Sequence, residues 1–151
     1  MCIRDRGTTY GIIGIDNNNV LVVGDMTAQA ALDRGVRDAV SFGPVLVVNG
    51  EAVEVNGSGS GLNPRTAIGQ RADGAILLLV TDGRGASGHL GATASDLISV
   101  MQEYGAVNAA NLDGGSSSTM VYNGGYEMTS VTFYYQNSSW KLPTAFVVMP
   151  K

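Results

Sequence analysis

Short runs of apolar residues, rather than long amphipathic stretches, dominate the pattern along this 151-residue chain. The runs at 10–15 and 20–23 have the β-branched character of strands, and the Asp-Asn-Asn-Asn segment between them favours a tight turn. The run VLVV at 45–48 is followed by Asn-Gly, which predicts a hairpin with a return strand at 52–55. Apolar runs predict further strands at 75–80, 106–112, 131–135 and 145–149, with a hairpin over 120–128.

Two segments have the features of helices. A helix over 28–34 is predicted by the threonine before it, which is a capping residue, and by the glycine after it. A second helix, over 93–104, begins with the capping-box residues Thr93 and Asp96. Its expected apolar face is formed by Leu97, Met101 and Tyr104.

The run AILLLV at 75–80 is continuously apolar, which is typical of a central strand covered on both faces. With the second helix and the strand at 106–112, it predicts a βαβ unit whose strands are parallel and whose crossover is right-handed. Antiparallel hairpins surround this unit. The predicted fold class is therefore α+β, with a mixed β-sheet, one βαβ unit and two to three flanking helices.

Composition places the chain among globular domains and narrows its partners. It is 44% hydrophobic and 15% charged, which suits one domain with a core. A net charge of -4 without a basic stripe argues against nucleic acid as a partner. No apolar run reaches the roughly 20 residues that a membrane helix needs. The single cysteine, Cys2, and the single histidine, His89, exclude an internal disulfide and Cys- or His-rich metal sites.

The first six residues, MCIRDR, look like translated sequencing adapter at the edge of a metagenomic contig. We therefore expect the domain to occupy residues 7–151 and its N-terminal part to be missing. A signal peptide or anchor is expected to have been lost with that part.

Two acidic residues follow the apolar strands of the predicted βαβ unit at equivalent positions. Asp82 follows the run at 75–80 and Asp113 follows the run at 106–112, and glycine comes after each. Ligands bind beyond the carboxyl ends of parallel strands, so we expect both carboxylates at one edge of the sheet. Their backbones would lie roughly 5 Å apart on neighbouring strands, or about 10 Å with one strand between. One Asp-Gly often makes only a turn, but two at equivalent strand ends favour a site.

The segment GGSSST at 114–119 offers consecutive backbone N–H groups and hydroxyls, which suit an anion such as phosphate. Arg84, two residues beyond Asp82, and Arg65, after the glycine-rich loop at 56–62, add guanidinium groups that can bind phosphate. No lysine follows the glycines and no G-x-S-x-G is present, so neither a Walker A loop nor a serine hydrolase is indicated. The carboxylates and hydroxyls are hard metal ligands, but the sequence contains no dedicated metal loop.

An alternative comes from the segment GRGASG at 83–88, which matches the G-x-G-x-x-G pattern of dinucleotide sites. The helix after it starts late for a bound pyrophosphate, and the unit lies among hairpins, so a nucleotide-cofactor enzyme stays an alternative. His89 is a candidate acid or base, or a solvated loop residue. Four aromatic residues can stack on a sugar or pack across strands: Tyr126, Tyr134, Tyr135 and Trp140.

Four segments with this order and spacing resemble the phosphodiester glycosidase domain family: NPRTAIG (63–69), VTDGR (80–84), GATASDLISVM (91–101) and NLDGGSSSTMVYNG (111–124). The segments VRDAVSFGPVLVVNGE (36–51) and LPTAFVVMP (142–150) also fit, so the resemblance covers about 36–150. Two departures stand out. An upstream Asn-Gly-Gly-Phe-Phe-like segment is not found here, and Lys141 stands near a position where the family often has arginine.

The resemblance implies hydrolysis of a sugar-1-phosphodiester of the N-acetylglucosamine-1-phosphodiester type, which releases the sugar and a phosphomonoester without a cofactor. It implies that the catalytic residues are Asp113, as nucleophile or base, Asp82, as its partner, and Arg65. The substrate- and phosphate-binding residues expected from it are Asn63, Thr66, Arg84, Gly114, Gly115, Ser117 and Ser118. An oxocarbenium-like transition state and an anionic leaving group account for this combination of carboxylates, arginines and donors.

The resemblance also implies an extracellular or cell-envelope bacterial hydrolase associated with exopolysaccharide, whose partner is a sugar-phosphate or glycan substrate. A second reading is a glycan- or phosphate-binding envelope module with the same pocket and no turnover. Turnover of the substrate distinguishes these two readings, and cofactor binding distinguishes the nucleotide alternative.

Overall fold

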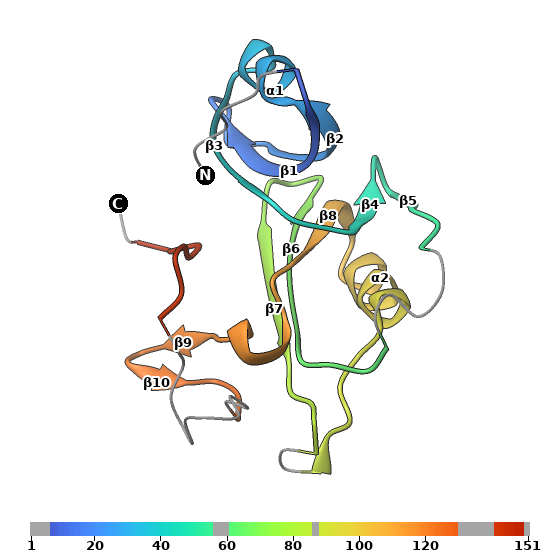
Figure 1. Cartoon of the computed structure of the whole chain (residues 1–151), viewed down its shortest axis with the longest axis vertical. Helices are drawn as coiled ribbons and strands as arrows, with labels where there is room; N and C mark the ends of the chain where they lie inside the picture. Colours follow the sequence, from blue (N-terminus) through green and yellow to red (C-terminus); the bar gives the residue numbers. More distant parts are fainter. Residues whose placement is uncertain (1–6, 56–60, 86–87, 130–140, 150–151) are drawn as a thin grey trace.

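The computed structural model describes residues 7–55, 61–85, 88–129 and 141–149 (Figure 1). The described strands form a three-stranded sheet, a five-stranded sheet and a small hairpin, and two α-helices accompany them. In Figure 1 the three-stranded sheet lies at one end of the molecule, and the hairpin lies towards the other. The predicted α+β class is confirmed.

The three-stranded sheet has the order β2-β1-β3 and is antiparallel. It contains β1 (Thr9–Asp16), β2 (Leu21–Thr27) and β3 (Val36–Ser41), and the last of these strands was not predicted. The predicted turn after β1 is present, and the Asp16 carboxylate closes it by accepting from the Asn18 and Val20 amides at 2.8 Å. The predicted first helix is also present as α1 (Ala28–Asp33), capped by the Thr27 hydroxyl.

The five-stranded sheet has the order β5-β4-β8-β6-β7. Its strands are β4 (Val45–Val48), β5 (Glu51–Ala52), β6 (Arg65–Arg71), β7 (Ile76–Thr81) and β8 (Ala106–Leu112). Because β6 is antiparallel to both β7 and β8, these two strands run in the same direction, as the predicted βαβ unit requires. They are separated by β6, so the described neighbours are all antiparallel where a mixed sheet was predicted.

Strand β6 was not predicted, and its presence changes the position of β7. Within the described residues β7 pairs only with β6 and lies at the edge of the sheet, so the prediction of a central, fully covered strand is wrong there. Ile76 is 43% exposed and Leu78 is 40% exposed, because the three-stranded sheet covers other parts of this face. Strand β6 is interior instead, with Ala67 and Ile68 only 1% exposed.

Both faces of the five-stranded sheet contribute to the core. Helix α2 (Ala94–Glu103) starts with the predicted capping box and packs Leu97 and Met101 against one face. Tyr104, expected on this apolar side, is 62% exposed, because the helix ends at the residue before it. The other face packs Ile68 and its neighbours against the three-stranded sheet.

Two side-chain amides, of the buried Gln70 and the partly buried Asn108, join the sheets where they pack together. The Gln70 side chain accepts from the Leu21 amide at 2.7 Å and donates to the Asn19 carbonyl at 2.9 Å. Asn108 donates to the Leu21 carbonyl at 3.0 Å. These bonds satisfy polar groups inside an apolar interface and fix how the two sheets align.

The last described part of the chain contains the predicted hairpin, formed by β9 (Val121–Tyr122) and β10 (Gly125–Tyr126). The predicted strand at 145–149 is absent from the described structure, where Val147 and Val148 are 71% and 81% exposed and no strand pairs with them. The predicted strand at 131–135 and Trp140 lie outside the described residues. No described helix has the length and apolar character needed to cross a bilayer.

Candidate active site

The two predicted acids emerge at the same edge of the five-stranded sheet. Thr81, the last residue of β7, pairs with Arg65, and Leu112, the last residue of β8, pairs with Thr66 on the same strand β6. The acids that follow therefore flank the start of β6, with two strand spacings, or about 10 Å, between their strands. This arrangement matches the larger of the two separations expected from the sequence, with one strand between the two acids.

The two carboxylates have different surroundings. Asp82 is partly buried, and its Oδ1 accepts from the Thr129 amide at 2.9 Å. Asp113 is exposed and has no hydrogen-bond partner within the described ranges. Asp82 is thus held in place, whereas Asp113 is open to a ligand. In the same ranges, no group of three or more His, Cys, Asp or Glu side chains could hold a metal ion.

Three glycines from two loops pack closely around the Asn63-Pro64 segment that leads into β6. A Cβ at Gly83 would lie 2.7 Å from the Pro64 nitrogen, and one at Gly114 would lie 2.8 Å from the Pro64 carbonyl oxygen. A Cβ at Gly91 would lie 2.6 Å from the Asn63 nitrogen. A side chain at any of these positions would push its loop away from the segment. Gly83 and Gly91 were not among the predicted site residues, although each lies within a motif segment.

Arg65 is only 7% exposed, and its guanidinium binds main-chain carbonyls. Its Nε donates to the Ala92 carbonyl at 3.0 Å, and its Nη2 donates to the Gly61 carbonyl at 2.7 Å. Burial lowers the pKa of Arg65, because the charged form loses hydration. In this structure Arg65 connects two loops at the edge of the site through these carbonyls.

The donor-rich segment after Asp113 folds into a turn around the 3₁₀ helix Gly115–Ser117. The Gly115 amide donates to the Pro64 carbonyl at 2.7 Å. The Thr66 hydroxyl donates to the Ser118 hydroxyl oxygen at 3.1 Å, and Ser118 is 1% exposed. Two predicted ligand-binding residues, Thr66 and Ser118, therefore anchor this turn to β6. Thr119, the next residue, has a buried hydroxyl without a partner among the described residues.

Arg84 brings a positive charge to this turn. Its Nη1 donates to the Ser116 hydroxyl at 2.9 Å, and the side chain is exposed. A Cβ at Gly115 would lie 2.8 Å from Arg84 Nη2, so glycine leaves room for the guanidinium. The loops after β7 and β8 thus join a guanidinium and a hydroxyl, which is a combination that attracts anions. The Gly115, Ser117 and Ser118 amides of the turn donate to main-chain carbonyls instead.

A hollow of about 280 Å³ lies beside Asp82. We call it the His89 hollow; it is lined by Thr81, Asp82, His89, Leu90, Gly91 and Ala92. The loop that carries it closes through bonds from the Gly85 amide to the His89 carbonyl at 2.8 Å and from the Arg84 amide to the Leu90 carbonyl at 3.4 Å. The sequence offers His89 as a candidate acid or base but contains no feature that predicts a role for Leu90, which is 70% exposed.

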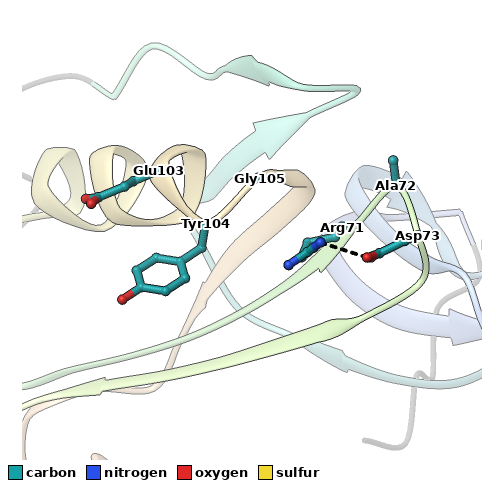
Figure 2. A pocket seen from close by; sticks show the side chains of 6 residues that line it. All are labelled: Arg71, Ala72, Asp73, Glu103, Tyr104 and Gly105. Atoms are coloured by element: carbon teal, nitrogen blue, oxygen red, sulfur yellow. Dashed lines mark hydrogen bonds and ion pairs between the residues drawn. The ribbon is translucent and has the colours of Figure 1, made fainter.

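A larger hollow of about 400 Å³ lies at the opposite end of the sheet. We call it the Tyr104 hollow; it is lined by Arg71, Ala72, Asp73, Glu103, Tyr104 and Gly105 (Figure 2). Arg71 and Asp73 form an ion pair at 2.7 Å, and the Tyr104 ring extends away from them (Figure 2). No motif residue lines this hollow, so the edge with Asp82 and Asp113 is the better candidate active site.

Two known proteins are similar to this chain in sequence. It is 34% identical over 117 residues to the SPbeta prophage-derived uncharacterized protein YomE of Bacillus subtilis, covering 74% of this chain and 18% of that protein. It is 26% identical over 151 residues to mouse N-acetylglucosamine-1-phosphodiester alpha-N-acetylglucosaminidase, covering 86% of this chain and 28% of the enzyme. The chain therefore spans less than a third of the length of these relatives.

Solved structures show the same fold. The catalytic domain of the zebrafish N-acetylglucosamine-1-phosphodiester alpha-N-acetylglucosaminidase, auto-inhibited by its pro-peptide, matches with a TM-score of 0.66 at 22% identity over 91% of this chain and 50% of that one. A hypothetical protein from Synechocystis matches with a TM-score of 0.55 at 28% identity over 71% and 21%. The model of the phosphodiester glycosidase family matches residues 3–149. This chain belongs to the phosphodiester glycosidase family.

Proposed function

We propose that this protein hydrolyses a sugar-1-phosphodiester, of the type named for its mouse relative, and releases the sugar and a phosphomonoester. The observation that carries the proposal is the contact of Arg84 with Ser116 at 2.9 Å. It places a guanidinium against the donor-rich turn, at the same edge as two carboxylates. A phosphodiester linked to a sugar needs both parts: a carboxylate for the anomeric carbon and positive charge for the phosphate.

In the proposed reaction the bond between the anomeric carbon and the phosphate oxygen breaks, and its electron pair leaves with the phosphomonoester. Water supplies the new hydroxyl on the anomeric carbon and a proton to the medium. Asp113 is exposed and unpartnered in the described structure, so it acts on the anomeric carbon, as nucleophile or by activating water. Arg84 and the Ser116 hydroxyl stabilise the charge that develops on the leaving phosphate.

Asp82 and Arg65 have supporting roles in this proposal. Asp82 is fixed by the Thr129 amide and faces the His89 hollow. Arg65 positions the loops by binding the Gly61 and Ala92 carbonyls. Precise placement of loops that carry reacting groups raises the reaction rate strongly, because small displacements misalign the reacting atoms.

The test is hydrolysis of methyl N-acetylglucosamine-1-phosphate in ¹⁸O-labelled water. We expect free N-acetylglucosamine and methyl phosphate as products, with the label in the sugar. Label in the methyl phosphate would show cleavage at phosphorus and would overturn the proposal. Binding of the diester without any turnover would support the glycan- or phosphate-binding module instead.

The start of the helix after the GRGASG segment at 83–88 argues against the nucleotide-cofactor alternative. Helix α2 begins at Ala94, and its N-terminal N–H groups are already served by the Thr93 and Asp96 side chains. An anionic pyrophosphate would have to displace a carboxylate from this position. Residues 86–87 of the pattern lie outside the described residues. An extracellular or envelope location and an exopolysaccharide substrate are further parts of the proposal, supported by the family resemblance alone.

A further inference from the structure

We propose that the His89 hollow is the subsite for the sugar ring of the substrate, and that Asp82, His89 and Leu90 select it. This inference rests on the proposed function and assigns the two halves of the substrate to two different surfaces. The phosphate belongs to Arg84 and the turn after Asp113, and the sugar belongs to the hollow.

The size of the hollow suits one small ring. Pockets for drug-sized ligands have volumes of roughly 300–1,000 Å³. The His89 hollow, at about 280 Å³, lies just below that range. A single pyranose is a ligand of this scale, whereas a nucleotide or an oligosaccharide would extend beyond the hollow.

The charge of the hollow favours a neutral ligand that carries hydroxyl groups. Among the described residues that line it, Asp82 is the acidic one, and none is an arginine or a lysine. An ionised carboxylate only accepts hydrogen bonds and repels a phosphate, so it favours a ligand whose hydroxyl groups donate hydrogen bonds. One Asp82 oxygen already accepts from the Thr129 amide, which fixes the carboxylate and directs its remaining capacity to a ligand.

The other lining groups complement the two kinds of surface on a sugar. The His89 side chain is exposed and can donate or accept a hydrogen bond. Leu90 is 70% exposed, and an apolar side chain at the rim of a polar hollow can pack against the C–H face of a pyranose. A hollow for a bare anion would need neither the carboxylate nor the leucine.

The loop geometry connects this subsite to the phosphate side. Arg84 and Leu90 lie opposite each other on the two limbs of one closed loop, joined by the bond at 3.4 Å. The limb with Arg84 reaches Ser116, and the other limb lines the hollow. A ligand that spans the loop therefore meets a hydroxyl-binding surface on one side and a guanidinium on the other, which is the order of groups in a sugar-1-phosphodiester.

The experiment compares inhibition of the wild type, His89→Ala, Leu90→Ala and Arg84→Ala by free N-acetylglucosamine and by methyl phosphate. We expect His89→Ala to raise KM and the inhibition constant of the free sugar by roughly 3- to 10-fold, the value of one hydrogen bond, with kcat changed much less. Leu90→Ala should act in the same direction. Inhibition by methyl phosphate should be unchanged in both variants and weakened in Arg84→Ala. Tyr104→Ala, in the opposite hollow, is the matched control.

Unchanged sugar inhibition in both His89→Ala and Leu90→Ala, with normal turnover, would overturn the inference and leave the proposed function intact. If the wild type does not hydrolyse the diester, the same variants are titrated with free N-acetylglucosamine by NMR. Loss of binding in His89→Ala but not in Tyr104→Ala would then support the sugar subsite while the proposed function fails. Equal binding by all variants would overturn the subsite as well.

Discussion

The two ends of the five-stranded sheet carry hollows of different size and different chemistry. The larger, the Tyr104 hollow, contains an Arg71–Asp73 ion pair at 2.7 Å whose charges satisfy each other. The smaller, the His89 hollow, is lined by a fixed Asp82. It lies at the sheet edge that also carries the exposed Asp113 and an arginine that reaches a donor-rich turn. The candidate site is identified by its motif residues and the exposed Asp113 carboxylate, not by volume.

The loops differ between the two ends as well. At the active-site end, main-chain segments meet so closely that glycines are required, as with Gly91 against Asn63. At the opposite end, Gly74 and Gly105 have no atoms within 4 Å of an added Cβ and serve local turns. Close packing of several loops holds catalytic groups precisely, and a simple turn has no such role.

The largest expected effect is loss of the exposed carboxylate at the active-site end. Asp113→Asn should lower kcat by roughly 10²- to 10⁴-fold, because the amide can be neither nucleophile nor base. Glu103→Gln makes the same chemical change in the Tyr104 hollow and should alter kcat by less than about twofold. Initial rates of sugar release measure both. Similar losses of kcat in the two variants would show that the two ends of the sheet do not differ in their importance for catalysis.

Loss of the guanidinium at the active-site end should have the next largest effect. Arg84→Ala should lower kcat by about 100-fold, because one group that stabilises the leaving phosphate is removed. Arg84→Lys should recover part of the rate, since it keeps the charge but not the forked geometry. Arg71→Ala, at the other end, is the control and should leave the rate within about twofold. A rate for Arg84→Ala equal to that control would contradict the phosphate role.

The difference in loop packing can be measured as stability. Gly91→Ala should lower the free energy of unfolding by about 2–3 kcal/mol, because its φ is +111° and its Cβ would meet the Asn63 backbone. Gly124→Ala has a similar positive φ of +80° but open space around the Cβ, so about 1 kcal/mol is expected. Urea unfolding of both variants gives the comparison. Equal losses would show that close packing adds nothing at Gly91.

The smallest effect concerns the start of α2, which directly follows Ala92 of the His89 hollow. Thr93→Ala should lower the free energy of unfolding by about 1 kcal/mol through loss of the cap. The Thr93 amide and then its hydroxyl donate to Asp96 and lower the pKa of that carboxyl. This contribution is present above about pH 4 and is lost as the pH falls through the lowered pKa. The stability difference between wild type and Asp96→Asn should therefore shrink in acid, and a constant difference from pH 7 to pH 2 would contradict it.

Elements governed by local rules could be predicted from the sequence. Residues close in sequence predict the capped helices α1 and α2 and the Asn-Gly hairpin after β4. They also predict that Asp82 and Asp113 share one edge of the sheet. Strand β6 could not be predicted in this way. Its polar residues Arg65 and Gln70 are buried because their partners come from distant loops and from the other sheet. Without β6, the apolar run of β7 was read as the central strand.

The roles of individual site residues were also hidden in the sequence. A motif predicts that Arg65 and Ser118 belong to the site, but not that one binds carbonyls and the other supports a turn. The hydroxyls and guanidinium groups in this part of the sequence look equally available. Burial and hydrogen-bond partners distinguish those that face a ligand from those that hold the loops.

The amides of Gln70 and Asn108 have a consequence for how the protein melts. Both bind the main chain at Leu21, in the other sheet, so separating the sheets breaks these hydrogen bonds together with the apolar contacts around them. Neither sheet can open alone at low cost. Thermal unfolding should therefore be a single cooperative transition for both sheets, and amide protons in β1 and β6 should exchange with solvent at the same rate.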